Sequence, residues 1–174
     1  MVKELLREST AIILGKQASE ISQIIYGKKP VNEFTIAKKM ELTINQTRNL
    51  LYRLSDHNLV TWIRKKDKRK GWYTYFWKID SVKTLEFLKN RLEDRLSHLQ
   101  NQIQSREANQ YYVCETCNIE FNEQDALFNN FICDECENLL KEKDNSKILK
   151  GLKRHTNKIS EKVEIISKEL EKEK

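Results

Sequence analysis

All four cysteines of the chain fall into two Cys-x-x-Cys pairs, a pattern that can hold a metal ion. Cys114 pairs with Cys117 and Cys133 with Cys136, and fifteen residues separate the pairs. Four thiolates at this spacing suit one tetrahedral Zn2+ in a zinc ribbon. Because the protein then fills every position around the ion, we expect a structural zinc with no open position for water or substrate.

Two disulfides or a redox dithiol are the alternatives for the same four residues. Disulfides belong mainly to oxidising compartments, and we expect no secretory leader from this sequence. Zinc is therefore the favoured interpretation.

The segment around the cysteines is strongly acidic. Residues 111–138 carry seven acidic side chains and no Lys or Arg, and four thiolates around Zn2+ add further negative charge. Such a module would repel a phosphate backbone. We therefore predict a protein-docking element or a structural cap in place of a finger that reads bases.

The net charge of +6 hides a division along the chain. Residues 1–80 carry +8, residues 81–110 carry +1 and residues 139–174 carry +4, against −7 in residues 111–138. A basic front and an acidic middle indicate two partners, or two patches of opposite potential on one large partner.

The composition favours a mainly α fold with a small β part. Of 174 residues, 39% are hydrophobic and 33% charged, with one Pro and four Gly. We expect a winged helix-turn-helix over residues 1–80, a linking helix over 81–110, the zinc ribbon over 111–138 and a C-terminal helix over 139–174. No apolar run approaches the ~20 residues of a membrane span, so a cytoplasmic protein with no membrane partner is expected.

The first domain has the element order of a winged helix. Apolar residues at helical spacing predict two helices, one before Gly27 and one after Pro30. Thr43 can cap a third, the recognition helix. Segments 59–64 and 72–79 are rich in β-branched and aromatic residues and predict a hairpin. On the recognition helix the open face is predicted to carry Asn45, Gln46, Arg48, Asn49 and Arg53.

The turn of the hairpin is predicted to be a cationic wing. Strand alternation gives the second strand an all-apolar face, expected to pack on the helices, and a mixed face with Trp72 and Phe76. With Trp62, these rings are expected to stay partly exposed as a stacking or docking surface. The alternative is a solvated charged loop whose rings close a small core. The apolar face consists of Tyr73, Tyr75, Trp77 and Ile79, and the wing cations are Arg64, Lys65, Lys66, Lys68, Arg69 and Lys70.

Apolar seams run along the helices on both sides of the ribbon. The first lies between residues 82 and 103 and is broken at Lys89, and the second lies between residues 152 and 170. An antiparallel pairing of the two helices, with the ribbon at the turn, would cover both seams. A second chain, as a partner or in a homodimer, could cover them instead. The sequence leaves both arrangements open.

One aromatic strand and the order of the modules resemble a known family. The strand reads Gly71-Trp72-Tyr73-Thr74-Tyr75-Phe76-Trp77-Lys78, and it follows a basic wing and precedes a leucine-rich helix and the four-cysteine ribbon. This combination resembles archaeal transcription factor E, the counterpart of the alpha subunit of eukaryotic general transcription factor IIE. The resemblance covers nearly the whole chain, and it implies a basal transcription initiation factor and not an enzyme.

Further expectations follow from this resemblance. Members of that family bind RNA polymerase across the clamp and stalk, aid DNA opening, and stabilise the open complex with TATA-binding protein and transcription factor B. By matching position, the wing cations with Trp72 and Phe76 would contact the polymerase and the non-template strand of promoter DNA. The four cysteines would hold zinc. In some lineages the alpha subunit pairs with a beta subunit, which would be a further partner.

Other functions fit only parts of the sequence. His57, His98 and His155 lie on separate predicted elements and no phosphate-binding loop is present, so no catalytic set is expected. The main alternative is a winged-helix repressor or metal sensor that dimerises through residues 82–103 and binds a palindromic operator. A scaffold adaptor without DNA contact is a third class. The acidic ribbon and the closed metal site argue against the repressor.

Overall fold

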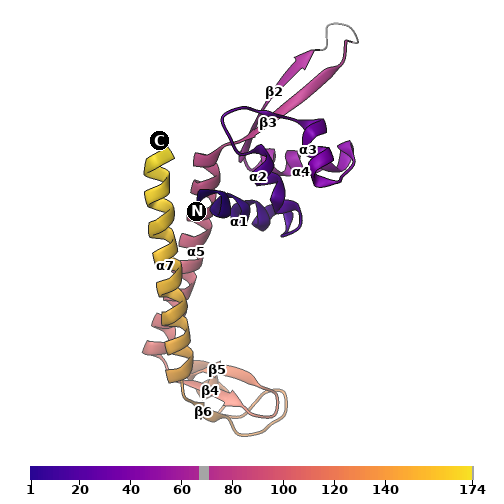
Figure 1. The fold of residues 1–174 in the computed structure, drawn as a ribbon. Coiled ribbons are helices and arrows are strands. Elements are labelled where there is room, and N and C mark those ends of the chain that lie inside the picture. The colour runs from indigo at the N-terminus through magenta and orange to yellow at the C-terminus, as the bar shows by residue number, and fades with distance from the viewer. Residues whose placement is uncertain (67–70, 174) are drawn as a thin grey trace. The chain divides into compact units, whose positions relative to one another are not determined.

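The computed structural model describes residues 1–66 and 71–173 (Figure 1). The chain forms two compact units. The first consists of Met1–Arg91 with Val163–Lys174, and the second of Leu92–Lys162. Two long helices, α5 (Ser81–Ala108) and α7 (Ser146–Glu173), belong partly to each unit. The domain limits expected at residues 80, 110 and 138 stay a prediction.

The first unit has the winged-helix order that the sequence predicts. Helices precede a hairpin, and a two-residue strand joins the hairpin in an antiparallel sheet of order β1-β3-β2. The sequence does not predict β1, because two residues are too few to show an alternating pattern. The elements are α1 (Val2–Leu14), the 3-10 helix η1 (Ala18–Glu20), α2 (Ile21–Ile25), β1 (Val31–Asn32), α3 (Glu33–Met40), α4 (Ile44–Asp56), β2 (Val60–Lys66) and β3 (Tyr73–Ile79).

Local side-chain hydrogen bonds fix where α3 and α4 begin. Thr43 caps α4 as predicted: its Oγ1 accepts from the Gln46 backbone N–H at 3.3 Å, and the Gln46 side chain accepts from the Thr43 N–H at 2.9 Å. Asn32 caps α3 by accepting from the Phe34 N–H at 2.8 Å. A residue in the left-handed region, Glu41 at φ 54°, then ends α3. These caps satisfy backbone donors that a helix end leaves free.

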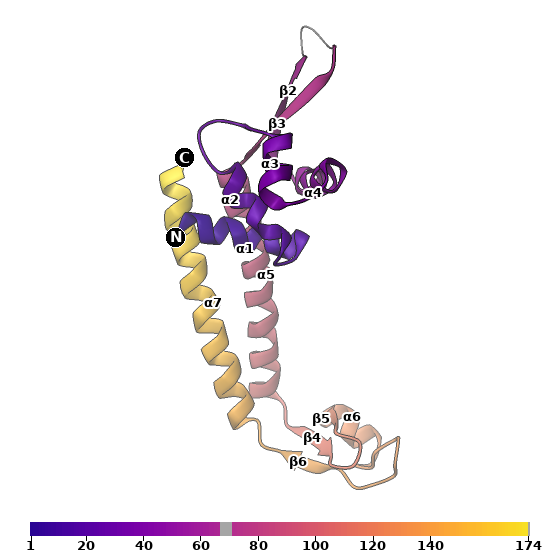
Figure 2. The ribbon, with the colours of Figure 1, turned by 45° about the vertical axis from the view of Figure 1, so that its right-hand side comes forward.

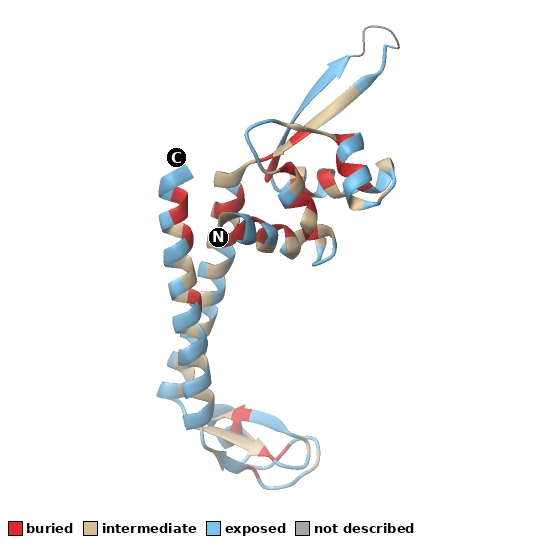
Figure 3. Cartoon of the chain, viewed as in Figure 1, coloured by how far each residue is buried: buried red, intermediate tan, exposed pale blue. Residues whose placement is uncertain are grey.

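The core of the first unit lies where the helices meet the base of the hairpin (Figure 3). Trp77 and Ile79 of β3 are each 1% exposed, and Tyr52 of α4 meets the Trp77 ring edge-on with centroids 6.0 Å apart. Burying such a side chain contributes roughly 1.5–3 kcal/mol. Other fully buried side chains are Leu6, Ile21, Ile25, Ile36, Leu51, Leu54, Leu59, Leu85 and Leu88.

Packing within the chain covers part of the apolar seams of helices α5 and α7. In the second unit the two helices lie side by side in both views (Figures 1 and 2), and Lys153 Nζ lies 2.5 Å from Glu107 Oε1. Ile159 of α7 is buried there, and Ile166 and Leu170 are buried in the first unit. Packing within the chain therefore buries part of the α7 seam, whereas Leu92, Leu96 and Leu99 of the α5 seam are half-buried. A second chain on these seams stays a prediction. Although both helices have 28 residues, no helix in the described part of the chain is long and apolar enough to cross a membrane.

The second unit joins these helices through a small antiparallel sheet of order β5-β4-β6. The outer strand β6 lies beyond residue 138, where the sequence analysis places the end of the ribbon. Its Lys-Glu-Lys sequence has no apolar alternation that could have revealed it. The elements are β4 (Tyr111–Cys114), β5 (Ile119–Asn122), α6 (Glu123–Phe128) and β6 (Lys141–Lys143).

Substitution of Gly151 and Gly15 isolates the effect of backbone conformation on the free energy of unfolding. A Cβ built on Gly151, inside α7, or on Gly15, after α1, meets nothing within 4 Å. Gly151→Ala is expected to raise the free energy of unfolding by about 0.5–1 kcal/mol, because Ala is the better helix former. Gly15 has φ 83°, so Gly15→Ala is expected to lower it by about 1 kcal/mol. Urea unfolding followed by circular dichroism measures both, and a change of the same sign in the two variants contradicts the argument.

Candidate metal centre and wing surface

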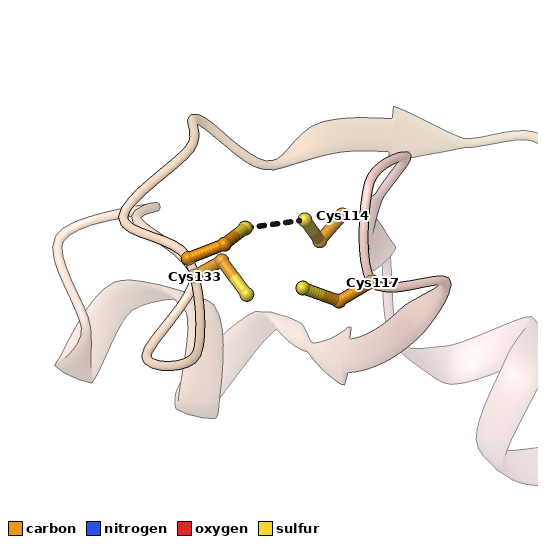
Figure 4. Close-up of side chains that lie close together, drawn as sticks. Cys114, Cys117 and Cys133 are labelled. Carbon is orange, nitrogen blue, oxygen red and sulfur yellow. Dashed lines mark hydrogen bonds between the residues drawn. The ribbon is translucent and has the colours of Figure 1, made fainter.

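The four cysteines come together as predicted. Their Sγ atoms all lie within 4.8 Å of one another, and Cys114 Sγ is 3.4 Å from Cys136 Sγ (Figure 4). None of the four forms a disulfide. Sulfurs at ~2.3 Å from a tetrahedral Zn2+ would be about 3.8 Å apart, so the cluster has the dimensions of a four-thiolate metal site.

The two Cys-x-x-Cys turns share one backbone geometry. The Asn118 N–H donates to the Cys114 carbonyl at 2.8 Å, and the Glu137 N–H donates to the Cys133 carbonyl at 2.9 Å. Asn118 and Glu137 both adopt left-handed conformations, with φ of 55° and 58°. Each turn therefore folds back on itself and presents its two sulfurs to the same side.

Hydrogen bonds make the thiols unequal. The backbone N–H of Cys117 donates to the Cys114 sulfur and lowers the pKa of Cys114 to about 7. The hydrogen bond between the Cys117 and Cys136 side chains, together with burial, raises the pKa of Cys117 to about 12. By themselves the Cys114 and Cys117 thiols therefore do not ionise together near neutral pH. A bound dication would let them ionise together, because it offsets their mutual repulsion.

Around the cluster, the ribbon surface is acidic and partly apolar. Leu127 is 64% exposed, Phe128 87% and Leu139 74%. An isolated bridge pairs Leu139 with Ile132, which is also exposed. The sequence analysis missed this patch. The available signal was a set of large apolar residues in an otherwise polar, acidic segment, which marks an interaction surface more often than a core.

Charged side chains fasten the ribbon sheet to the end of α5. The Arg106 guanidinium donates to Glu120 at 2.7 Å and to Asn145 at 3.0 Å, and Lys143 also pairs with Glu120. The hydrogen bonds from Lys143 and Arg106 lower the pKa of Glu120. Glu120, one of the seven acidic residues of the ribbon, is therefore paired with cations within the second unit.

In the hairpin, β2 and β3 pair so that Trp62 lies opposite Trp77 and Arg64 opposite Tyr75. Trp62 contacts Tyr75 edge-on with ring centroids 5.6 Å apart. The prediction that the whole Tyr73 to Ile79 face is core is wrong for Tyr73, which is 47% exposed. The hairpin reaches beyond the helices (Figure 1), so only its base is covered.

The opposite face of the hairpin carries the other predicted rings. Trp72 is 75% exposed, and Phe76 is half-buried with Lys65 Nζ 5.1 Å from its ring centroid. On the Trp77 face, the Arg64 guanidinium lies 4.8 Å from the Tyr73 ring centroid. Both faces of the outer hairpin therefore combine rings with cations. Arg64, Lys65 and Lys66 are exposed, and Lys68, Arg69 and Lys70 lie outside the described residues.

On the recognition helix α4, Asn45, Gln46, Asn49 and Arg53 are exposed as predicted, and Arg48 is half-buried. Both arginines of this face are engaged by neighbouring helices. Arg48 donates from Nε and Nη2 to the two carboxylate oxygens of Glu33, each at 2.8 Å, and Glu33 is fully buried. The guanidinium of Arg53 donates to the carbonyl of Ile13 at the end of α1. Helical periodicity indicates that Arg48 and Arg53 lie off the apolar face of α4. It does not show that α3 and α1 approach α4 on that side.

Comparison with known proteins identifies the family of the chain. Residues 2–108 match the profile of the TFIIE alpha subunit family. The chain belongs to this family. Transcription factor E of Sulfolobus acidocaldarius is 32% identical over 162 residues, which cover 92% of this chain and 93% of that protein. Transcription factor E of Archaeoglobus fulgidus is 29% identical over 170 residues, 96% of this chain and 94% of that protein.

Membership in the TFIIE alpha family confirms two expectations from the sequence. The chain is a basal transcription initiation factor and not an enzyme, and membership implies association with the initiation machinery. The family profile ends at residue 108, before the cysteines. The ribbon is instead covered by relatives that match nearly the full chain, such as transcription factor E of Archaeoglobus fulgidus.

The buried ion pair of α4 gives a test of its structural role. Arg48→Ala is expected to lower the free energy of unfolding by about 3 kcal/mol, because it leaves the Glu33 carboxylate buried without a partner. Replacing both partners together, Glu33→Leu with Arg48→Met, should cost less than Arg48→Ala alone.

Urea unfolding of the winged-helix unit measures these differences. The matched control is Asn49→Ala, an exposed change on the same helix that should stay within about 0.5 kcal/mol of wild type. If Arg48→Ala behaves like Asn49→Ala, the pair is not a structural element of α4.

Proposed function

We propose that this chain acts at promoter opening: it binds RNA polymerase at the clamp and stalk, aids melting of promoter DNA and stabilises the open complex. The observation that carries the proposal is the wing, where exposed rings and cations share one hairpin beside a recognition helix with internally engaged arginines. Such a surface suits contact with a protein or with unpaired bases better than readout of base edges in an intact groove.

The wing residues have separate proposed roles. Trp72 and Phe76 supply rings on which bases or apolar side chains can stack, and Arg64, Lys65 and Lys66 supply charge beside them. Their proposed targets are the polymerase clamp and the non-template strand. Lys68, Arg69 and Lys70 are included because they continue the same cationic run in the sequence.

The ribbon is proposed to dock on protein within the initiation complex. Its acidic surface disfavours DNA, and exposed Leu127, Phe128 and Leu139 offer the apolar contact area that protein interfaces use. TATA-binding protein and transcription factor B are proposed neighbours in the same complex. A beta subunit is a further proposed partner, inferred from the resemblance to the family.

Zn2+ is the proposed metal, in a structural role. Four soft thiolates in a compact cluster favour Zn2+ over hard cations, and four protein ligands leave no position for substrate. Cys114, Cys117, Cys133 and Cys136 would all bind it as thiolates. The ribbon core has few other buried side chains, so metal binding would supply much of its folding energy.

The wing proposal is tested by separating contact from folding. Trp72→Ala is expected to reduce promoter opening by the loss of about 1–3 kcal/mol of stacking, with little change in melting temperature, because Trp72 is exposed. Trp77→Ala removes a buried ring and should cost about 3–5 kcal/mol of stability. Permanganate reactivity of promoter thymines with purified polymerase, at a weak promoter, measures opening, and calorimetry measures melting.

Two outcomes would count against the wing. Equal losses of stability in Trp72→Ala and Trp77→Ala would remove the argument for an exposed contact ring. A variant with Ala at Lys65 and Lys66 that loses affinity for one duplex operator, while polymerase binding stays intact, would favour the repressor.

The metal proposal predicts one zinc ion per chain in elemental analysis, lost on chelation. Cys114→Ser or Cys133→Ser should unfold the ribbon while the winged-helix unit keeps its own melting transition, because the two units have separate cores. Purified protein with stoichiometric disulfides and no metal would contradict the prediction.

A further inference from the structure

Charge is segregated along α7. Residues 146–162 contain six Lys or Arg and one Glu, whereas residues 163–173 contain two Lys and four Glu. A solvated helix is stabilised when opposite charges stand at i and i+4, but Lys150, Arg154 and Lys158 repeat at this spacing with one sign and repel one another. The first half of α7 therefore carries an electrostatic cost that an anionic partner would remove.

These cations form a stripe on the outer side of α7. At 3.6 residues per turn they lie on the side opposite Leu152 and Ile159, which belong to the apolar seam. All of the stripe residues are exposed. The α7 stripe consists of Lys147, Lys150, Arg154 and Lys158.

Most of the stripe is free of internal partners. Within residues 1–66 and 71–173, the structure gives Lys150, Arg154 and Lys158 no acidic group and no hydrogen-bond acceptor, whereas the neighbouring Lys153 pairs with Glu107. Asp144, next to the first turn, is already engaged by the backbone N–H and the hydroxyl of Ser146. The charges of the stripe are therefore available to an external ligand.

The chemistry of this face selects among anionic ligands. Residues 146–162 contain no Phe, Tyr or Trp, and the one ring among them, that of His155, does not belong to the stripe, so the stripe itself offers no ring for the stacking of unpaired bases. No exposed large apolar side chain lies between Lys147 and Lys158, although protein interfaces generally have an apolar centre. Regular cations without rings or apolar groups suit a phosphate backbone.

The dimensions suit a duplex. The stripe extends over ~16 Å of helix axis, with neighbouring cations about 5–6 Å apart. One strand of B-DNA places roughly five phosphates along that length, at ~3.4 Å per phosphate. We propose that the α7 stripe binds the phosphate backbone of duplex DNA without sequence preference. This site lies in the second unit and is separate from the proposed wing contacts of the first.

The test measures binding of the full chain to a 20-base-pair duplex of arbitrary sequence, without polymerase, by fluorescence anisotropy across a KCl series. The stripe variant carries Lys150→Gln, Arg154→Gln and Lys158→Gln, which keep good helix formers. Its plot of log K against log salt should be less steep by about 2.7, because each lost phosphate contact removes ~0.9 from the slope. Affinity at 100 mM KCl should fall by about tenfold or more.

Two further variants separate position from total charge. The matched control, Lys38→Gln, Lys39→Gln and Lys168→Gln, removes three exposed charges outside the stripe and should change the slope by less than about one. The charge-conserving variant, Lys150→Arg with Lys158→Arg, should bind like the wild type. Far-ultraviolet circular dichroism should show the same helix content in all of them.

The proposal is overturned if the stripe variant and the matched control have the same salt slope. It is also overturned if the loss appears only on single-stranded DNA. Wild-type duplex binding by the stripe variant, together with lost polymerase binding, would assign the stripe to an acidic protein partner. The duplex-binding assay contains no polymerase, so its failure leaves the wing proposal standing.

Discussion

The meeting of the two Cys-x-x-Cys turns is the constraint on which the second unit depends. Apart from Cys114 and Cys133, the ribbon core contains only Phe121, Ala126 and Leu140 as buried side chains. So small a core cannot offset the conformational entropy of ordering the loops around it. With a metal in the cluster, the ribbon becomes a fixed turn that joins α5 to α7. The chain enters the ribbon through β4 and leaves it through β6, and the antiparallel pairing of these strands brings the adjoining ends of α5 and α7 together.

In the first unit, the arginines of the recognition helix are engaged within the fold. A recognition helix that reads base pairs needs side chains free to reach the major groove. In α4 the arginines instead hold neighbouring helices, Arg48 through a buried carboxylate and Arg53 through the end of α1. Exposed cations also stand beside rings on the hairpin, which extends past the helices. The wing is therefore the proposed contact surface of this unit.

Features governed by local rules could be predicted from the sequence. The spacing of the cysteines indicated the metal site, and the pattern Thr43 to Gln46 indicated the start of α4 through its capping box. Alternation correctly placed Trp77 and Ile79 in the core. These features depend on neighbours in sequence or on ligand chemistry with few geometrical solutions.

Features governed by distant neighbours could not be predicted. Alternation shows which face of β3 points toward the helices, but not how far along the strand they reach, and Tyr73 was misplaced for that reason. The partner of Arg48 stands fifteen residues away on another helix. The exposed Phe128 patch depends on how the short helix α6 packs, and β6 depends only on pairing with β4. Each would have required the tertiary structure.

The bonds around Glu120 give the second unit a mechanical property. Arg106 at the end of α5, Lys143 on β6 and Asn145 before α7 meet in one network, and Gln110 adds a bond to the Lys143 carbonyl at 3.1 Å. These bonds hold the first and last strands of the ribbon, β4 and β6, to the ends of α5 and α7. The junction is therefore fixed at several points and does not have the form of a hinge. A movement of the ribbon relative to the ends of α5 and α7 would have to break these bonds together.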